Sequence, residues 1–264
     1  MPFVFNLSRN HPGTQYALEG LPFENEREHS MNIRNLGRRS QKGFTLVEIA
    51  IVLVIIGLLL GGILKGQEMI TQAKIKNAIA DFSGISAAYH GYVDRYKKIP
   101  GDDPCAGTGT GLTLGNCGTT TARWSGAAGG NGNGLVGGKY NSATAADESR
   151  LWWDHLRRSG FVSGTGDQQP FNALTGMIGV QTGDAQTTTG PALGGFTGLI
   201  ICSANLPDKI AIAVDTQMDD GVPNNGSVRG LLQTAPNPDV INTTFASTAY
   251  QETGTNVYTI CRAL

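Results

Sequence analysis

The sequence predicts an α+β fold in which a long N-terminal α-helix packs on a C-terminal antiparallel β-sheet head. Residues 44–64 form an apolar run that is interrupted only by Thr45 and Glu48. Residues 65–99 continue a helical pattern without proline. The rest of the chain is rich in glycine and contains several short segments with strand character, which together favour a sheet.

The apolar run is long enough to cross a membrane. At about 1.5 Å per residue, a helix over 44–64 spans roughly 30 Å of hydrocarbon. The first positive charge after the run is Lys65, whereas the segment before it is basic. This asymmetry predicts a cytoplasmic N-terminal flank and a C-terminal bulk on the far side of the membrane. The basic residues of the flank are Arg34, Arg38, Arg39 and Lys42.

Glu48 stands out because it is a carboxylate inside this run. Such a group costs roughly 2.5 to 3.5 kcal/mol at the membrane centre and less near its edge, so it requires a partner. Cleavage after Gly43 would create an ammonium group on Phe44, which could neutralise Glu48 of the same chain or of a neighbour. An ordinary signal peptide or an uncleaved anchor is the alternative, but no small-x-small cleavage pattern follows the run.

The segment "KGFTLVEIAIVLVIIGLLLGGI" resembles the class III signal of the type IV pilin family, with the resemblance extending from Lys42 to about Lys76. It implies that prepilin peptidase cuts after Gly43, that Phe44 becomes the N-methylated terminus, and that Glu48 is the assembly carboxylate. Subunits of that family assemble into a helical filament whose core is the bundled N-terminal helices. Many members have a proline near the end of the run, where this chain has glycines instead.

The chain is predicted to divide into four parts. We expect a leader over 1–43, a transmembrane and assembly helix over 44–64, an amphipathic stem over 65–99 and a globular head over 100–264. Translation is expected to start at Met31, which opens a basic leader of ordinary length for the family, with a longer natural leader as the alternative.

The stem carries one apolar stripe, which we expect to pack on the sheet of the same chain. An electron relay along its aromatic residues is the alternative. The helix should end at Ile99, because the residue before Pro100 avoids the α region. The stripe consists of Ile75, Phe82, Tyr89 and Tyr96, with Ile79 and Val93 beside them.

Residues 101–143 are rich in Gly, Thr and Asn and predict a surface loop. The match to G-x-G-x-x-G at 132–137 is interpreted as chance, because no strand precedes it. The chain contains no G-x-S-x-G, H-E-x-x-H or C-x-x-C pattern, so no enzyme activity is predicted. A formal net charge of -1 gives no basic field, and no nucleic-acid partner is predicted.

A short helix follows, with a capping box formed by Thr144 and Asp147 and a stop at Gly160. His155 is expected to be a packed residue of this helix, with a catalytic base as the alternative. The residues expected to face inward are Leu151, Trp152, His155 and Leu156.

Five segments have strand character: "GMIGVQT", "GLIICSA", "KIAIAVDTQ", "SVRGLLQ" and "NVYTICRAL". In the third, over 209–217, Ile210, Ile212 and Val214 alternate with small or polar residues, which predicts a strand with one buried face. The segments "DDGVPNNGSVRG", "YHGYVDRYKKIPGDD" and "WWDHLRRSGFVSG" also resemble the bodies of large bacterial prepilin-like proteins.

The loop after the third segment is a candidate Ca²⁺ site, because hard cations prefer several oxygen ligands from one loop. Related pseudopilins bind calcium in a C-terminal loop, which the resemblance extends to this chain. The alternative is that these residues only form turns. No other cofactor is predicted. The candidate ligands are Asp215, Asp219, Asp220 and Asn224.

All four cysteines lie on the expected non-cytoplasmic side and should be oxidised. A Cys105–Cys117 bond would close a local loop. A Cys202–Cys261 bond would join the last strand to the sheet and resembles the C-terminal disulfide of many pilins. Crossed pairings and a zinc site are the alternatives that the sequence leaves open.

The function that the resemblance implies is a structural subunit of a type IV pilus-like filament. A pseudopilin of a type II secretion system and a non-polymerising membrane-anchored binding protein are the alternatives. The implied partners are copies of the chain, other pilin-like subunits, prepilin peptidase, the assembly machinery and, before assembly, membrane lipid. The implied location is the bacterial inner membrane and then a periplasmic or cell-surface filament.

Overall fold

The computed structural model describes four stretches of the chain, residues 43–107, 122–183, 192–241 and 249–264. The expected leader, its start at Met31 and the expected disulfide partner Cys117 lie outside the described residues. The chain divides into two compact units, one ending at Val52 and the other beginning at Leu53.

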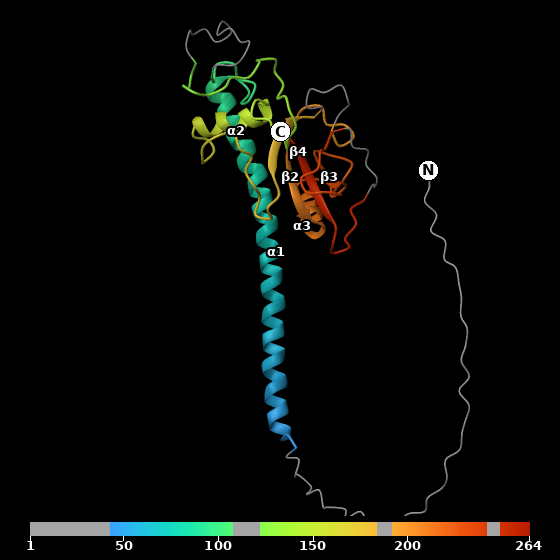
Figure 1. Ribbon diagram of the computed structural model, residues 1–264. Coiled ribbons are helices and arrows are strands. Elements are labelled where there is room, and N and C mark those ends of the chain that lie inside the picture. The colour runs from blue at the N-terminus through green and yellow to red at the C-terminus, as the bar shows by residue number, and fades with distance from the viewer. Residues whose placement is uncertain (1–42, 108–121, 184–191, 242–248) are drawn as a thin grey trace, which may run out of the picture. The chain divides into compact units, whose positions relative to one another are not determined.

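The predicted α+β class is confirmed: the described residues contain a long N-terminal helix and a C-terminal sheet of four antiparallel strands (Figure 1). The strands lie in the order β1-β2-β4-β3, so the last strand of the chain lies inside the sheet. The elements are α1 (Leu46–Tyr96), α2 (Glu148–Arg158), β1 (Ile178–Thr182), β2 (Leu199–Pro207), α3 (Asp208–Met218), β3 (Val228–Leu232) and β4 (Val257–Ala263).

The sheet separates two hydrophobic cores. Successive side chains of a strand point to opposite faces. Ile201 and Ile260 therefore join one core with buried residues of α1, α2 and α3. Ile200 and Cys202 face the other way, into a second core that loops complete. The loop residues of this second core are Tyr140, Ala192, Leu193, Phe196 and Val240.

The later part of α1 buries a row whose members are three or four residues apart, as a helix face requires. Ile75 and Phe82 lie in this row as predicted, but Tyr89 and Tyr96 are only partly buried, and Tyr92 is fully buried in their place. A seven-residue repeat drifts by about 20° per heptad on a straight helix, so the buried face moves off the predicted stripe. The row is Ile75, Ala78, Phe82, Ile85, Ala88 and Tyr92.

Helix α1 ends at Tyr96, and the predicted end at Ile99 is therefore wrong. Lys97 adopts a left-handed conformation with φ of 54°, and its N–H donates to the Val93 carbonyl at 2.8 Å. The proline restricts only the residue immediately before it, whereas a left-handed residue ends a helix wherever it occurs.

A buried carboxylate joins the end of α1 to the loop that follows. The Tyr92 hydroxyl donates to Asp103 Oδ2 at 2.7 Å, and the Cys105 N–H donates to Oδ1 at 2.8 Å. Arg123 forms an ion pair with the same carboxylate. Asp103 is fully buried, so these donors offset the cost of removing its charge from water.

The described residues of the glycine-rich segment, 101–107 and 122–143, contain no helix or strand, as a loop requires. The prediction of a surface loop is wrong for 101–107, which are buried because this stretch packs against α2. Two buried carboxylates, Asp102 and Glu148, hold the loop. Each carboxylate accepts two backbone N–H groups of the loop at 2.8 to 2.9 Å. A Cβ atom on Gly130 would lie 2.2 Å from the Gly101 carbonyl oxygen, so glycine is required there for close backbone packing. The four donors are the N–H groups of Asn131, Asn133, Gly134 and Gly137.

Helix α2 has the predicted inward face, since Leu151, Trp152, His155 and Leu156 are all buried. Its predicted capping box is wrong. Asp147 is the N-cap residue, but its side chain makes no capping bond and accepts instead from the Ser142 hydroxyl at 2.6 Å. The predicted stop is confirmed: Gly160 has φ of 80°, and the N–H of Phe161 returns to the Leu156 carbonyl at 3.0 Å.

His155 connects α2 to two loop segments. Its ring is fully buried, and Nδ1 accepts from the Gly101 N–H at 2.9 Å. Because Nδ1 acts as the acceptor, Nε2 carries the proton and donates to the Ala128 carbonyl at 2.8 Å. The ring must be neutral in this arrangement, because Nδ1 can accept a hydrogen bond only when it carries no proton.

The predicted strand over 209–217 is a helix in the structure, α3, so this prediction is wrong. Ile210 and Val214 are four residues apart, a spacing that satisfies both a strand period and a helix period. The buried neighbours decide between them: Ala211 is buried and Ile212 is only partly buried, which is the helical pattern. Asp208, in the first helical turn, also accepts from the Lys209 N–H at 2.8 Å.

The Cys202–Cys261 disulfide that the resemblance implied is present between β2 and β4, where the two residues lie directly opposite each other. Cys105 is also disulfide-bonded. A native disulfide contributes about 2 to 5 kcal/mol in a small secreted domain. The bond fixes the register of the terminal strand in the middle of the sheet.

The environment of His155 predicts a loss of stability in mild acid. Burial lowers its pKa, against the Ala128 carbonyl and the carboxylates of Asp103 and Asp154, which raise it. The unfolded chain then binds this proton at a higher pH than the folded chain. The free energy of unfolding should fall by up to about 1.4 kcal/mol per pH unit below pH about 6.5, as denaturant titrations would measure.

The matched control is His90, whose side chain is exposed on α1. His155→Gln should lower stability at neutral pH and reduce the slope in mild acid, whereas His90→Gln should leave that slope unchanged. If the pH dependence of stability in mild acid were unaltered in the His155 variant, the assignment of this acid sensitivity to His155 would be contradicted.

Candidate functional site

The first turn of α1 is closed by a capping box between Thr45 and Glu48. The Thr45 N–H and hydroxyl both donate to Glu48 Oε2 at 2.8 Å, and the Glu48 N–H donates back to Thr45 Oγ1 at 3.2 Å. The Ile49 N–H donates to the Thr45 carbonyl at 3.3 Å, which identifies Thr45 as the N-cap residue. The Glu48 carboxylate is thus turned toward the N-terminus of its own helix.

Thr45 is the residue of this site that the sequence analysis missed. The signal was present, because T-x-x-E before an apolar run is the capping-box pattern. The box was assigned to Thr144 and Asp147, where it does not form, and overlooked where it does.

The predicted terminal residues, Gly43 and Phe44, are both exposed, and the Phe44 side chain is 82% exposed. In this chain the Phe44 nitrogen belongs to a peptide bond, so it is not an ammonium group that could pair with Glu48. The described structure accordingly shows the carboxylate with Thr45 as its hydrogen-bond partner.

The apolar run forms an exposed surface along the first part of α1. The large apolar side chains from Phe44 to Leu64 are each 46% to 86% exposed. Among the described residues, α1 is the one helix that is long and apolar enough to cross a membrane. The helix continues through Gly61 and Gly62 without interruption.

The first charged residues after the apolar surface form a pair. Lys65 Nζ lies 2.8 Å from Glu68 Oε2, and both side chains are exposed. Charged and polar residues become frequent from this point on, so the uninterrupted apolar surface ends at Leu64. The end of the membrane-spanning segment at Leu64 stays a prediction.

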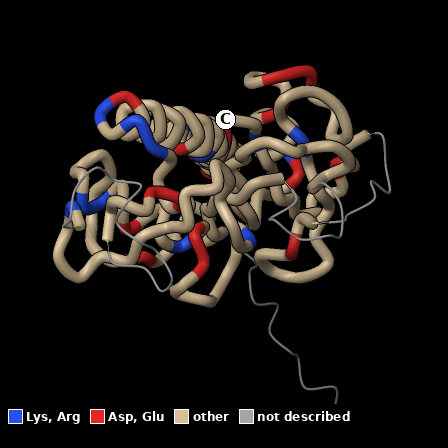
Figure 2. The backbone as a smooth tube through the Cα atoms, turned by 90° about the horizontal axis from the view of Figure 1, so that it is seen from above, with Lys and Arg blue, Asp and Glu red and all other residues tan. Residues whose placement is uncertain are grey.

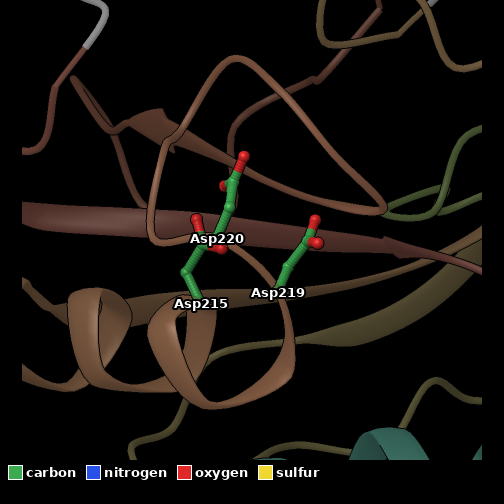
Figure 3. A group of neighbouring side chains, drawn as sticks. All are labelled: Asp215, Asp219 and Asp220. Carbon is green, nitrogen blue, oxygen red and sulfur yellow. The ribbon is translucent and has the colours of Figure 1, made fainter.

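The second candidate site is the group of Asp215, Asp219 and Asp220 (Figure 3). Asp215 lies in the last turn of α3, and the other two follow the helix. Each residue offers a carboxylate oxygen within 4.8 Å of the others. The fourth predicted ligand, Asn224, lies in the same loop, and its role stays a prediction.

Hydrogen bonds within the chain already use these carboxylates. Asp215 Oδ2 accepts from the Tyr250 hydroxyl at 2.5 Å, and Asp220 Oδ1 accepts from the Val222 N–H at 2.8 Å. Asp219 Oδ2 accepts from the Val228 N–H at 2.9 Å, at the start of the edge strand β3. The alternative interpretation, that these residues shape the turn, therefore has direct structural support.

Electrostatics distinguish Asp215 from its neighbours. Burial raises its pKa, and the negative charges of Asp220 and Asp219 raise it further, while the Tyr250 hydrogen bond lowers it. A bound divalent cation would reverse this effect, because it stabilises all three ionised carboxylates.

Acidic and basic residues are interspersed around the chain when it is viewed from above (Figure 2). This agrees with the formal net charge of -1. The absence of a nucleic-acid partner stays a prediction.

The exposed apolar helix and the capped carboxylate at its start indicate a membrane-anchored protein whose α+β head is joined to the anchor by the same helix. The comparisons define its class further. The family model of the prokaryotic N-terminal methylation motif matches residues 38–64, which makes this segment a class III signal of the type IV pilin kind.

This motif supports a type IV pilin-like or pseudopilin precursor and points to a structural protein. Comparison with curated proteins gave no match, and comparison with solved structures gave none.

Calcium binding by the acidic group stays a prediction. Saturating calcium should raise the melting temperature of the detergent-solubilised chain by about 5 °C or more, because the cation binds only the folded loop. Asp220→Asn removes one charge and retains an oxygen for the Val222 N–H, so it should reduce this shift. A melting curve that is the same in calcium and in chelator would leave only the turn-forming role.

Proposed function

We propose that this chain is the precursor of a structural subunit of a type IV pilus-like filament. The observation that carries the proposal is the methylation motif at 38–64, whose apolar part coincides with the exposed surface of α1. Prepilin peptidase removes the leader after Gly43 and methylates the new terminus at Phe44. The mechanism of the mature protein is polymerisation.

The exposed surface of α1 supports polymerisation because it is too apolar to remain in water. Burial stabilises apolar surface by roughly 25 cal/mol per Å². Lipid tails cover this surface before assembly, and the α1 helices of neighbouring subunits cover it in the filament. Both environments are apolar, so transfer between them costs little hydrophobic free energy.

Glu48 supplies the specificity that apolar contacts lack. In the precursor, its carboxylate is satisfied in part by the two Thr45 donors. After cleavage, the ammonium of Phe44 on an incoming subunit is the strongest partner that a carboxylate at this depth can find. The pair sets the axial position of the incoming helix, because each charge is desolvated in the apolar surroundings and stays uncompensated unless it meets the other.

The head is attached to this helix through a packed interface. From Ile75 to Tyr92, α1 shares one hydrophobic core with the sheet. Tyr92 is also bonded to Asp103 of the following loop. The stem and the head are therefore expected to enter the filament together.

We place the subunit in the bacterial inner membrane with a cytoplasmic N-terminus before assembly, and in a periplasmic or surface filament afterwards. Its partners are copies of itself, other pilin-like subunits, prepilin peptidase and the membrane assembly machinery. Calcium at Asp215, Asp219 and Asp220 would order the head, and its binding is tested separately.

Glu48→Gln is the experiment that tests this function. Glutamine retains an oxygen for the Thr45 donors, so cleavage, methylation and membrane insertion should persist. Filament yield should collapse, because loss of one member of a buried ion pair costs roughly 3 to 5 kcal/mol. Intact mass reports the mature N-terminus at Phe44, and shearing followed by immunoblotting reports filaments.

Two matched variants separate charge from structure. Thr45→Ala removes the capping box, at about 0.5 to 2 kcal/mol, but retains the charge and should still assemble. Glu68→Gln removes an exposed carboxylate of the same helix and should behave as wild type. Normal filaments from a processed Glu48→Gln protein would exclude the charge mechanism. A mature terminus other than Phe44 would exclude the pilin-like precursor itself.

A further inference from the structure

The chain contains three Asn-Gly pairs, at 131–132, 133–134 and 225–226. In such a pair the backbone nitrogen of the glycine can attack the asparagine side-chain amide. Glycine permits the attack because it has no side chain to obstruct the ring that forms. All three asparagines are exposed to water, so exposure does not distinguish them.

The attacking nitrogens of the first two pairs are engaged. The N–H of Gly132 donates to the Asp102 carbonyl at 3.0 Å, and the N–H of Gly134 donates to Asp102 Oδ2 at 2.8 Å. Asp102 is 5% exposed, and these bonds satisfy its buried oxygens. Either nitrogen must therefore break a bond to a buried acceptor before it can react.

The asparagine side chains of these two pairs are also held. Asn131 Oδ1 accepts from the Asn133 N–H at 3.0 Å, and Asn133 Oδ1 accepts from the Leu135 N–H at 2.9 Å. Each amide is thus turned toward the backbone two residues further on. This orientation must also change before the side-chain carbon can meet the attacking nitrogen.

The third pair differs in its glycine N–H and in its asparagine side-chain oxygen. Among the described residues, the N–H of Gly226 makes no hydrogen bond, and neither does Asn225 Oδ1. The side chain of Asn225 is held only by its nitrogen, which donates to Asp220 Oδ2 at 3.0 Å. The loop thus leaves the nucleophile and the carbonyl carbon free to approach, while it binds the group that leaves.

We infer that Asn225 is a site of spontaneous deamidation in the folded protein, and that Asn131 and Asn133 are protected. The Gly226 nitrogen loses its proton and attacks Asn225 Cγ, forming a five-membered succinimide and releasing ammonia. Water then opens either carbonyl of the ring, giving aspartate or isoaspartate at position 225. The net change is amide plus water to carboxylate plus ammonium, and no oxidant or cofactor is needed.

The product changes the acidic loop in a defined way. A donor to Asp220 is replaced by a carboxylate, so the bond at 3.0 Å is lost. A fourth negative charge is added beside the three carboxylates whose oxygens lie within 4.8 Å of one another. The subunit becomes more acidic with age.

The test is peptide mapping of the full-length, detergent-solubilised chain after incubation at mildly alkaline pH in water labelled with oxygen-18. In the folded protein, Asn225 should incorporate the label at least about tenfold faster than Asn131 or Asn133. Tenfold corresponds to about 1.4 kcal/mol, the order of one hydrogen bond that must be broken. A more acidic form should appear in isoelectric focusing at the same rate.

The chain unfolded in denaturant is the reference, because there the three pairs have similar surroundings and should react within about threefold of one another. Asn225→Gln should abolish the acidic form and leave the other two peptides unchanged. Equal rates for the three pairs in the folded protein would overturn the inference. So would an unlabelled Asn225 in folded protein whose unfolded form reacts.

Discussion

Helix α1 is continuous through two environments that require different surfaces, and the rest of the structure depends on this constraint. Its backbone hydrogen bonding runs from Leu46 to Tyr96, while large apolar side chains as far as Ile70 are exposed. From Ile75 on, one row of side chains is buried beneath the head. A helix with this distribution is stable only where an apolar environment covers its first part. Lipid or neighbouring helices can provide that cover, so the proposed function assigns anchoring and assembly to the same segment.

The head compensates for its irregular loops with buried polar contacts. Asp102, Asp103 and Glu148 each accept backbone N–H groups, and the His155 ring bonds two loop segments. A long glycine-rich connection has few apolar side chains to bury, so its order must come from hydrogen bonds to a few fixed groups. Gly130 lies against the Gly101 carbonyl, so glycine is needed here for close backbone packing as well as for conformational freedom.

Sequence reasoning succeeded where a pattern was long or chemically specific. The apolar run, the methylation motif and the inward face of α2 were all predicted. It failed at α3, because Ile210 and Val214 fit a strand and a helix equally well and only the packing against the sheet decides. It also placed a capping box at Thr144 and missed the one at Thr45. Residue types alone do not show whether a side chain already bonds another group, as Asp147 bonds Ser142.

By itself, the sequence determined where the apolar segment with its methylation motif lies and where the carboxylate of that segment stands. Both follow from the order of residues along one helix, and no distant contact is needed to define them. Only the tertiary structure decided the partners of the buried carboxylates and the conformation of α3. Within the described stretches, it also decided which Asn-Gly pair has a glycine nitrogen without a hydrogen bond, because Asp102 lies about thirty residues before the glycines that it holds. Those outcomes depend on which groups come into contact across the fold, and the spacing of residues in a local segment does not determine such contacts.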